Sequence, residues 1–96
     1  MAAYVIYQGD VTDPERYEKY KVLAAASIVA AGGRYIVRGG DVEALEGDAP
    51  AGRTVVLEFA TRQAAVDWYR SDEYTAIRQI REGAARARLY VVDGVE

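Results

Sequence analysis

The sequence predicts an α+β fold in which one antiparallel sheet of four strands carries helices. Residues 3–8, 34–38, 53–59 and 89–92 are rich in β-branched and aromatic residues and are typical of strands. Apolar residues recur at helical spacing between the first and second of these segments, and again between the third and fourth. The resulting order, β-α-β-β-α-β, is that of a ferredoxin-like domain. We expect residues 1–96 to form one domain, because a chain of 96 residues suffices for a single modest core.

The first predicted helix is marked at both ends. Asp13 can cap its N-terminus, Pro14 suits the first helical position, and Glu15 lies near the positive end of the helix dipole. Gly32 and Gly33 end the helix, because glycine adopts the left-handed conformation of a C-terminal cap at little cost. The residues that recur at helical spacing between these ends are Tyr17, Tyr20, Ala24, Ile28 and Ala31.

Two further helix starts follow the third strand. Thr61 can cap a second helix, and Ser71 can cap a third, with Asp72 and Glu73 in its first turn. A long glycine-rich connection, residues 39–52, joins the second strand to the third. Connections of this length tend to carry function or to reach a partner, so we expect this one to cover a pocket or to contact a second subunit.

Both faces of the predicted sheet are apolar. A sheet with helices on one face and water on the other alternates apolar with polar residues, and these strands do not. In the first strand, Tyr4 and Ile6 point to one face, and Val5 and Tyr7 point to the other. In the third strand the two sets are Val55, Leu57 and Phe59 on one face, and Thr54, Val56 and Glu58 on the other. In the fourth strand they are Leu89 and Val91 on one face, and Tyr90 and Val92 on the other. Because one set of helices covers only one face, we predict a homodimer whose two sheets pack face to face.

Composition excludes several classes of protein. The net charge of −3, from 12 basic and 15 acidic residues, argues against nucleic acid as a partner. No apolar run approaches the ~20 residues of a membrane span, and no signal segment precedes the first strand. We therefore expect a cytoplasmic protein with no membrane partner. The absence of cysteine and histidine removes thiolate nucleophiles, the commonest general base and the usual metal and haem ligands, so we predict no metal site and no cofactor.

Several motifs, taken together, resemble the DUF1330 family of small bacterial proteins. They are GGRYIVRGGDVEALEG, starting at Gly32, then RTVVLEFATRQAAVDWYRSDEY, starting at Arg53, and then Arg81. The resemblance covers residues 4–94. It implies the fold of the dimeric α/β-barrel superfamily, which includes cofactor-independent monooxygenases, haem-degrading enzymes, lactone isomerases and small ligand-binding domains. The family itself has no established function, so the resemblance implies a fold and no particular chemistry.

Glu58 is the most unusual candidate residue, because it lies inside an apolar strand segment, VVLEF. A carboxylate in such a place needs a partner, or its pKa rises. One interpretation is a structural ion pair with Arg34, Arg38 or Arg53. The other is a general base, or a carboxylate that orients a ligand.

Two arginines and three aromatic residues complete the candidate ligand site, together with Gly39 at the start of the long connection. Arg38 and Arg81 can bind a carboxylate or a phosphate, or each can form a salt bridge within the protein. Tyr20, Trp68 and Tyr74 can line a pocket with polar handles, or they can serve only as core at the contacts between helices and sheet.

Three functions are compatible with these residues. The first is a homodimer that binds a small polar or anionic molecule in a pocket between sheet and helices. The second is a cofactor-independent enzyme, an isomerase or an oxygenase, with Glu58 or a tyrosine as its acid–base group. The third is a structural or regulatory dimer without a ligand. An open pocket lined by tyrosines, together with an unpaired Glu58, favours the first two. A filled interior with every carboxylate bridged favours the third.

Overall fold

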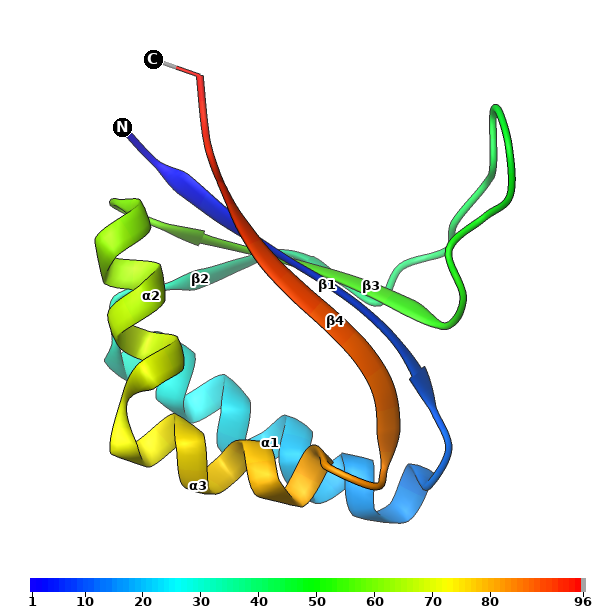
Figure 1. Ribbon diagram of the computed structural model, residues 1–96, viewed down its shortest axis with the longest axis horizontal. Coiled ribbons are helices and arrows are strands. Elements are labelled where there is room, and N and C mark those ends of the chain that lie inside the picture. The colour runs from blue at the N-terminus through cyan, green and yellow to red at the C-terminus, as the bar shows by residue number, and fades with distance from the viewer. Residues whose placement is uncertain (96) are drawn as a thin grey trace.

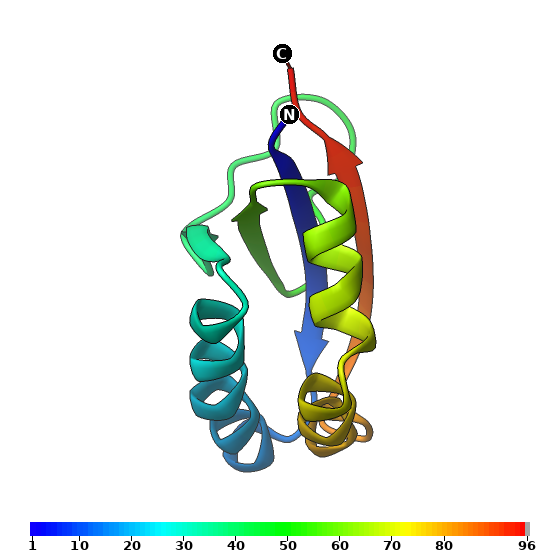
Figure 2. The ribbon, with the colours of Figure 1, turned by 90° about the vertical axis from the view of Figure 1, so that its left-hand side faces the viewer.

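The computed structural model of the protein describes residues 1–95. Its four strands form one antiparallel sheet in the order β2-β3-β1-β4, and the helices lie together on one side of it (Figures 1 and 2). The predicted ferredoxin-like α+β fold is therefore confirmed. The elements are β1 (Ala3–Val11), α1 (Pro14–Ala30), β2 (Arg34–Arg38), β3 (Arg53–Phe59), α2 (Arg62–Arg70), α3 (Asp72–Arg81) and β4 (Ala85–Asp93).

The helix ends follow the predicted capping residues. The side chains of Asp13, Thr61 and Ser71 each accept a hydrogen bond from the backbone N–H three residues further on. These bonds satisfy amide groups that have no partner within the helix. At the other end of α1, Gly32 has a φ of 86°, in the left-handed region expected of a C-terminal stop. No helix within residues 1–95 is long and apolar enough to cross a membrane.

Strand β1 and its neighbour at the edge of the sheet, β4, are longer than predicted. β1 continues to Val11 and β4 starts at Ala85, and these two residues are paired across the sheet. Gly9 and Asp10 are typical of turns, and the alternating alanines and arginines at the start of β4 have weak strand propensity. Pairing between the two strands outweighs these local preferences, which is why propensity alone places both ends incorrectly.

The sheet has one buried face and one open face, and both are apolar as predicted. Its helix-facing side chains are buried in the core. On the open face, the exposed fractions of Tyr90 and Val92 are 50% and 48%. The buried face is made by Val5, Tyr7, Val55, Leu57 and Phe59, and its core also contains Trp68 and Tyr74 from the helices.

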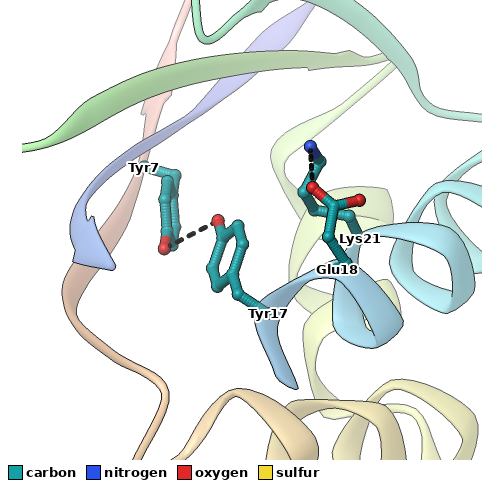
Figure 3. Close-up of polar contacts among 4 residues, drawn as sticks. All are labelled: Tyr7, Tyr17, Glu18 and Lys21. Carbon is teal, nitrogen blue, oxygen red and sulfur yellow. Dashed lines mark hydrogen bonds and ion pairs between the residues drawn. The ribbon is translucent and has the colours of Figure 1, made fainter. Parts of the chain in front are cut away.

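Tyrosine hydroxyls inside the core are hydrogen-bonded to one another. The hydroxyls of Tyr20 and Tyr74 lie 2.6 Å apart and join α1 to α3. Tyr17 donates to Tyr7 over 3.0 Å and joins α1 to β1 (Figure 3). A buried hydroxyl without a partner costs about 1–3 kcal/mol, so these pairs stabilise the packing of α1 against its neighbours.

The connection between β2 and β3 extends away from the sheet and the helices (Figure 1). Residues 40–49 are all exposed. The chain then returns through Gly52, whose φ is 71° and where an added Cβ would overlap with the backbone carbonyl of Gly9. Gly52 therefore combines a left-handed conformation with close backbone contact where β3 begins beside β1.

We predict that Gly52→Ala destabilises the protein much more than Gly47→Ala. Gly47 has nearly the same φ, 70°, but an added Cβ there meets nothing within 4 Å. Both variants lose about 1–2 kcal/mol from the left-handed backbone. Only Gly52→Ala also forces β1 and β3 apart, and we expect a total loss of at least ~3 kcal/mol. Urea unfolding measures both, and equal losses would contradict this description of the turn.

The hydroxyl pair between α1 and α3 predicts non-additive mutations. Tyr20→Phe and Tyr74→Phe each leave one buried hydroxyl unpaired and should each lower the free energy of unfolding by about 1–2 kcal/mol. The double variant removes both hydroxyls, so its loss should fall about 1 kcal/mol short of the sum. Thermal and urea unfolding of the four proteins measure this coupling. Simple additivity would show that the pair contributes nothing to stability.

Candidate functional site

A cavity of about 40 Å³ lies between α1 and the helix-facing side of the sheet. Its polar lining consists of four tyrosines and three cationic side chains, and no carboxylate of residues 1–95 lines it. The lining residues are Val5, Tyr7, Tyr17, Tyr20, Lys21, Ala24, Ile28, Tyr35, Arg38, Arg53, Val55, Leu57, Trp68 and Leu89. A space of this size admits water or one polar group of a ligand, because it exceeds the ~10–15 Å³ that one water needs.

Helical spacing and a β-bulge bring this lining together. On α1, Tyr17, Tyr20 and Lys21 follow the i, i+3, i+4 pattern and share one face. On β2, the register shifts between Tyr35 and Val37, so that Tyr35 pairs with Leu57 and Arg38 pairs with Val55. In a regular strand, residues three apart point to opposite faces. The bulge turns Tyr35 and Arg38 to the same face, and the Arg38 guanidinium lies 4.4 Å from the Tyr35 ring centroid.

Arg53 contributes the deepest cation of the lining. Its guanidinium lies 5.9 Å from the centroid of the Tyr17 ring. Its Nε is buried and has no hydrogen-bond partner within residues 1–95. Gly39 packs directly against this group, since a Cβ at Gly39 would lie 2.8 Å from the Arg53 side chain. The structure thus places Gly39 as the residue that makes room for Arg53.

Lys21 has the one carboxylate partner among the three cations. Its Nζ lies 3.0 Å from a carboxylate oxygen of Glu18, one turn earlier on α1 (Figure 3). The Glu18 side chain is largely exposed, and pairs of this kind contribute little to stability. Arg38 and Arg53 have no carboxylate within 4.0 Å in the described part of the chain. The cavity lining therefore keeps a net positive charge.

Arg81 packs against two of the lining tyrosines, Tyr7 and Tyr20, and adds positive charge near the cavity. It is only 8% exposed, and its guanidinium lies 5.6 Å from the ring centroids of both Tyr7 and Tyr20. Its Nε has no hydrogen-bond partner, and no carboxylate within residues 1–95 comes within 4.0 Å of it. The salt bridges considered for Arg38 and Arg81 from the sequence are thus not found among the described residues. Aromatic rings take the place of the carboxylate around Arg81.

The buried tyrosines keep their protons. Burial raises the pKa of Tyr17 and of Tyr20 well above the ordinary value for a phenol, and the neighbouring arginine Arg81 only partly opposes this rise. Both hydroxyls are therefore neutral throughout the physiological range. They can donate hydrogen bonds to a bound group, and they are poorly suited to accept a proton as general bases.

Glu58 lies on the open face of the sheet and does not reach this cavity. It pairs across the strands with Tyr4 and Arg34. Arg34 Nε lies 2.6 Å from one carboxylate oxygen, and the Tyr4 hydroxyl donates to the other over 3.1 Å. The Arg34 hydrogen bond lowers the pKa of Glu58, although partial burial opposes it. Of the two interpretations weighed for this residue, the geometry corresponds to the structural ion pair.

The remaining predicted site residues divide between lining and support. Tyr20, Arg38 and Trp68 line the cavity. Tyr74 supports two of the lining residues through the hydroxyl pair and through a ring contact of 4.2 Å with Trp68. The polar lining residues absent from the predicted set are Tyr7, Tyr17, Lys21, Tyr35 and Arg53. Tyr17 could have been found from its helical spacing to Tyr20, and Lys21 from its helical spacing to Tyr17, but the bulge that redirects Tyr35 leaves no mark in the sequence.

Solved structures with the same fold are distant in sequence. A protein of unknown function from Rhodopseudomonas palustris superposes with a TM-score of 0.78 at 17% identity, covering 99% of this chain and 83% of that chain. SnoaB, a cofactor-independent oxygenase from Streptomyces nogalater, gives a TM-score of 0.65 at 9% identity, covering 99% and 94%. A dimeric protein of unknown function and ferredoxin-like fold from Bacteroides fragilis gives 0.61 at 14% identity, covering 97% and 96%. These likenesses show the fold alone.

No curated protein is significantly similar to the chain. The family comparison is more informative, and it agrees with the motifs that bracket β2, β3 and α2. The model of DUF1330, a domain of unknown function, matches residues 2–95, and the chain belongs to this family.

Proposed function

We propose that the protein binds a small organic anion, with the anionic group seated in the cavity between α1 and the sheet. One observation carries this proposal. Three cationic side chains and four tyrosines converge on a space that no carboxylate of residues 1–95 lines. A cavity that only reflected imperfect packing would be lined by apolar side chains, because a buried charge without a partner costs free energy.

An anion would supply the partners that these groups lack. Arg53 Nε is buried and unpaired, and Arg38 is exposed at the edge of the same cavity. A planar guanidinium binds a carboxylate with parallel hydrogen bonds. Arg38 and Arg53 are therefore the residues that we expect to contact the anion, with Lys21 nearby to add charge.

The tyrosine pairs offer further hydrogen bonds to the same group. Each pair has two hydroxyl hydrogens, and one of them forms the hydrogen bond between the two tyrosines. In the pair where Tyr17 donates to Tyr7, the Tyr7 hydrogen remains available. A neutral O–H donor beside a cation suits a carboxylate, and it discriminates against a cationic or purely apolar molecule.

The same geometry favours binding over acid–base catalysis. The enzyme alternative needs a general base, for which Glu58 or a tyrosine was the candidate. Glu58 lies on the other face of the sheet with its pKa lowered by Arg34, and burial raises the pKa of Tyr17 and Tyr20. Neither kind of group is poised near neutral pH beside the cavity. A binding role is therefore the one that this site supports best.

We also propose that the protein acts as a homodimer of single-domain chains that meet through their open sheet faces. The family match over nearly the whole chain supports one domain, and a structural neighbour from Bacteroides fragilis is itself described as dimeric. The open face carries Ile6, Val37, Val56, Tyr90 and Val92, and a second copy would bury them.

We propose that the extended connection contacts the second subunit rather than covering the pocket. It extends away from the sheet and the helices (Figure 1), none of residues 40–52 lines the cavity, and Leu45, near its middle, is 88% exposed. An apolar side chain held out in this way suits a surface supplied by a second subunit.

The anion site predicts a dependence on charge in both ligand and protein. Benzoate and hexanoate should raise the melting temperature by binding only the native state, and the uncharged amides benzamide and hexanamide should not. Arg53→Met, which keeps most of the side-chain volume, should weaken carboxylate binding about 10- to 100-fold, because a hydrogen bond to a charged group contributes about 1.5–3 kcal/mol. Thermal-shift and calorimetric titrations measure these effects.

A matched control is Arg86→Met, since Arg86 is an exposed arginine of β4 that lines neither this cavity nor its neighbour. It should bind carboxylates as the natural protein does. Amides that bind as tightly as the acids, or carboxylate binding that survives in Arg53→Met, would count against an anion site.

The dimer predicts that charge on the open face separates the subunits. Val56→Asp places a carboxylate at the centre of that face, where burial against a second copy would cost several kcal/mol, so dimerisation should weaken at least ~100-fold. Val22→Asp, on the outer face of α1, is the control and should remain dimeric. Light scattering coupled to gel filtration measures the mass. A natural protein that is monomeric at high concentration would refute the dimer.

A further inference from the structure

A second cavity lies beside the first, on the other side of Trp68. Its volume is about 250 Å³, and it lies between α2, which supplies Ala65 and Val66, and β4, which supplies Val91. Val5, Trp68 and Leu89 line both cavities. These three side chains therefore lie between the two spaces and contact both.

The two cavities differ in chemistry in a way that suits the two ends of one molecule. The first is small, and its polar lining is cationic and phenolic. The second is about six times larger and is lined mainly by aliphatic and aromatic side chains, and within residues 1–95 Arg70 is its one charged residue. Pockets for whole organic ligands typically hold ~300–1,000 Å³. The first cavity falls far short of this range, and the second approaches its lower end without the cluster of cations.

We infer that the ligand is an amphipathic monocarboxylate whose apolar body extends past Trp68 into the second cavity. This inference rests on the proposed anion site and adds the shape and polarity of the molecule bound there. The carboxylate would remain beside Arg38 and Arg53. Burial of the apolar body would supply most of the affinity, because the second cavity is the larger and the less polar of the two.

Of the side chains between the two cavities, Trp68 is held in place by its contacts, whereas Leu89 can change its rotamer. Trp68 is held in place, since its Nε1 donates to Ser27 Oγ over 3.2 Å and its ring packs 4.2 Å from that of Tyr74. Leu89 is partly buried and packs against the hydrophobic core. A change of the Leu89 rotamer is therefore the means by which we expect a chain to pass from one cavity to the other.

A series of straight-chain acids from acetate to decanoate tests this inference by calorimetric titration. Affinity should rise about fourfold for each methylene, the equivalent of ~0.8 kcal/mol of burial, until the second cavity is full, and then level off. The longer acids should also change the fluorescence of Trp68, because it is the single tryptophan of the chain and lines both cavities.

Variants of the second cavity give the decisive comparison. Val66→Phe fills space on the α2 side and should abolish the rise with chain length, while acetate keeps its affinity within about twofold. Val91→Phe fills the β4 side and serves as a second test should the first variant fold poorly. Val22→Phe, at a position of α1 that is 68% exposed, is the matched control and should reproduce the natural series.

The outcomes separate this inference from the function on which it rests. Carboxylates that bind with no dependence on chain length, or with a dependence that survives in both cavity variants, would overturn the inference and leave the anion site standing. Failure of every acid to bind, or equal binding of octanamide and octanoate, would overturn the anion site itself. A rise with chain length that only the cavity variants abolish would support both.

Discussion

Buried hydroxyls that hydrogen-bond to one another are the interaction on which this structure depends. Between α1 and its neighbours, Tyr20 pairs with Tyr74 and Tyr17 pairs with Tyr7. A tyrosine pair satisfies its own hydroxyls without an acidic residue. The layer can therefore surround Arg81 with aromatic rings, and no carboxylate within residues 1–95 pairs with it. The tyrosines likewise bring no negative charge to the neighbouring cavity, which Lys21, Arg38 and Arg53 line.

The two faces of the sheet differ in whether their charged side chains are paired. On the open face, Glu58 is neutralised by Arg34 and hydrogen-bonded by Tyr4, so the charge is balanced within the chain. On the helix-facing side, Arg38 and Arg53 of the cavity lining have no carboxylate partner within residues 1–95. A face whose carboxylate is paired within the same chain can pack against a second copy without burying an unpaired charge. A cavity whose arginines have no carboxylate partner is suited to receive an anion from solution.

Much of the fold could be predicted from the sequence, because caps, strand composition and apolar alternation are local signals. The candidate site was harder to predict for a definite physical reason. Alternation divides each strand into two sets, but when both sets are apolar it cannot tell which set faces the helices. Glu58 was therefore grouped with pocket residues although it lies on the open face. The bulge in β2, which turns Arg38 toward the cavity, depends on pairing with β3 rather than on the residues of β2.

The most direct test of this account is a crystal structure of the protein grown with octanoate. The account predicts one molecule in each protomer, with its carboxylate beside Arg38 and Arg53 and its chain passing Trp68 toward α2 and β4. Octanoate found only on the open face of the sheet, or a cavity that holds nothing but water at saturating octanoate, would contradict the central claim that the tyrosine-lined space between α1 and the sheet is an anion-binding site.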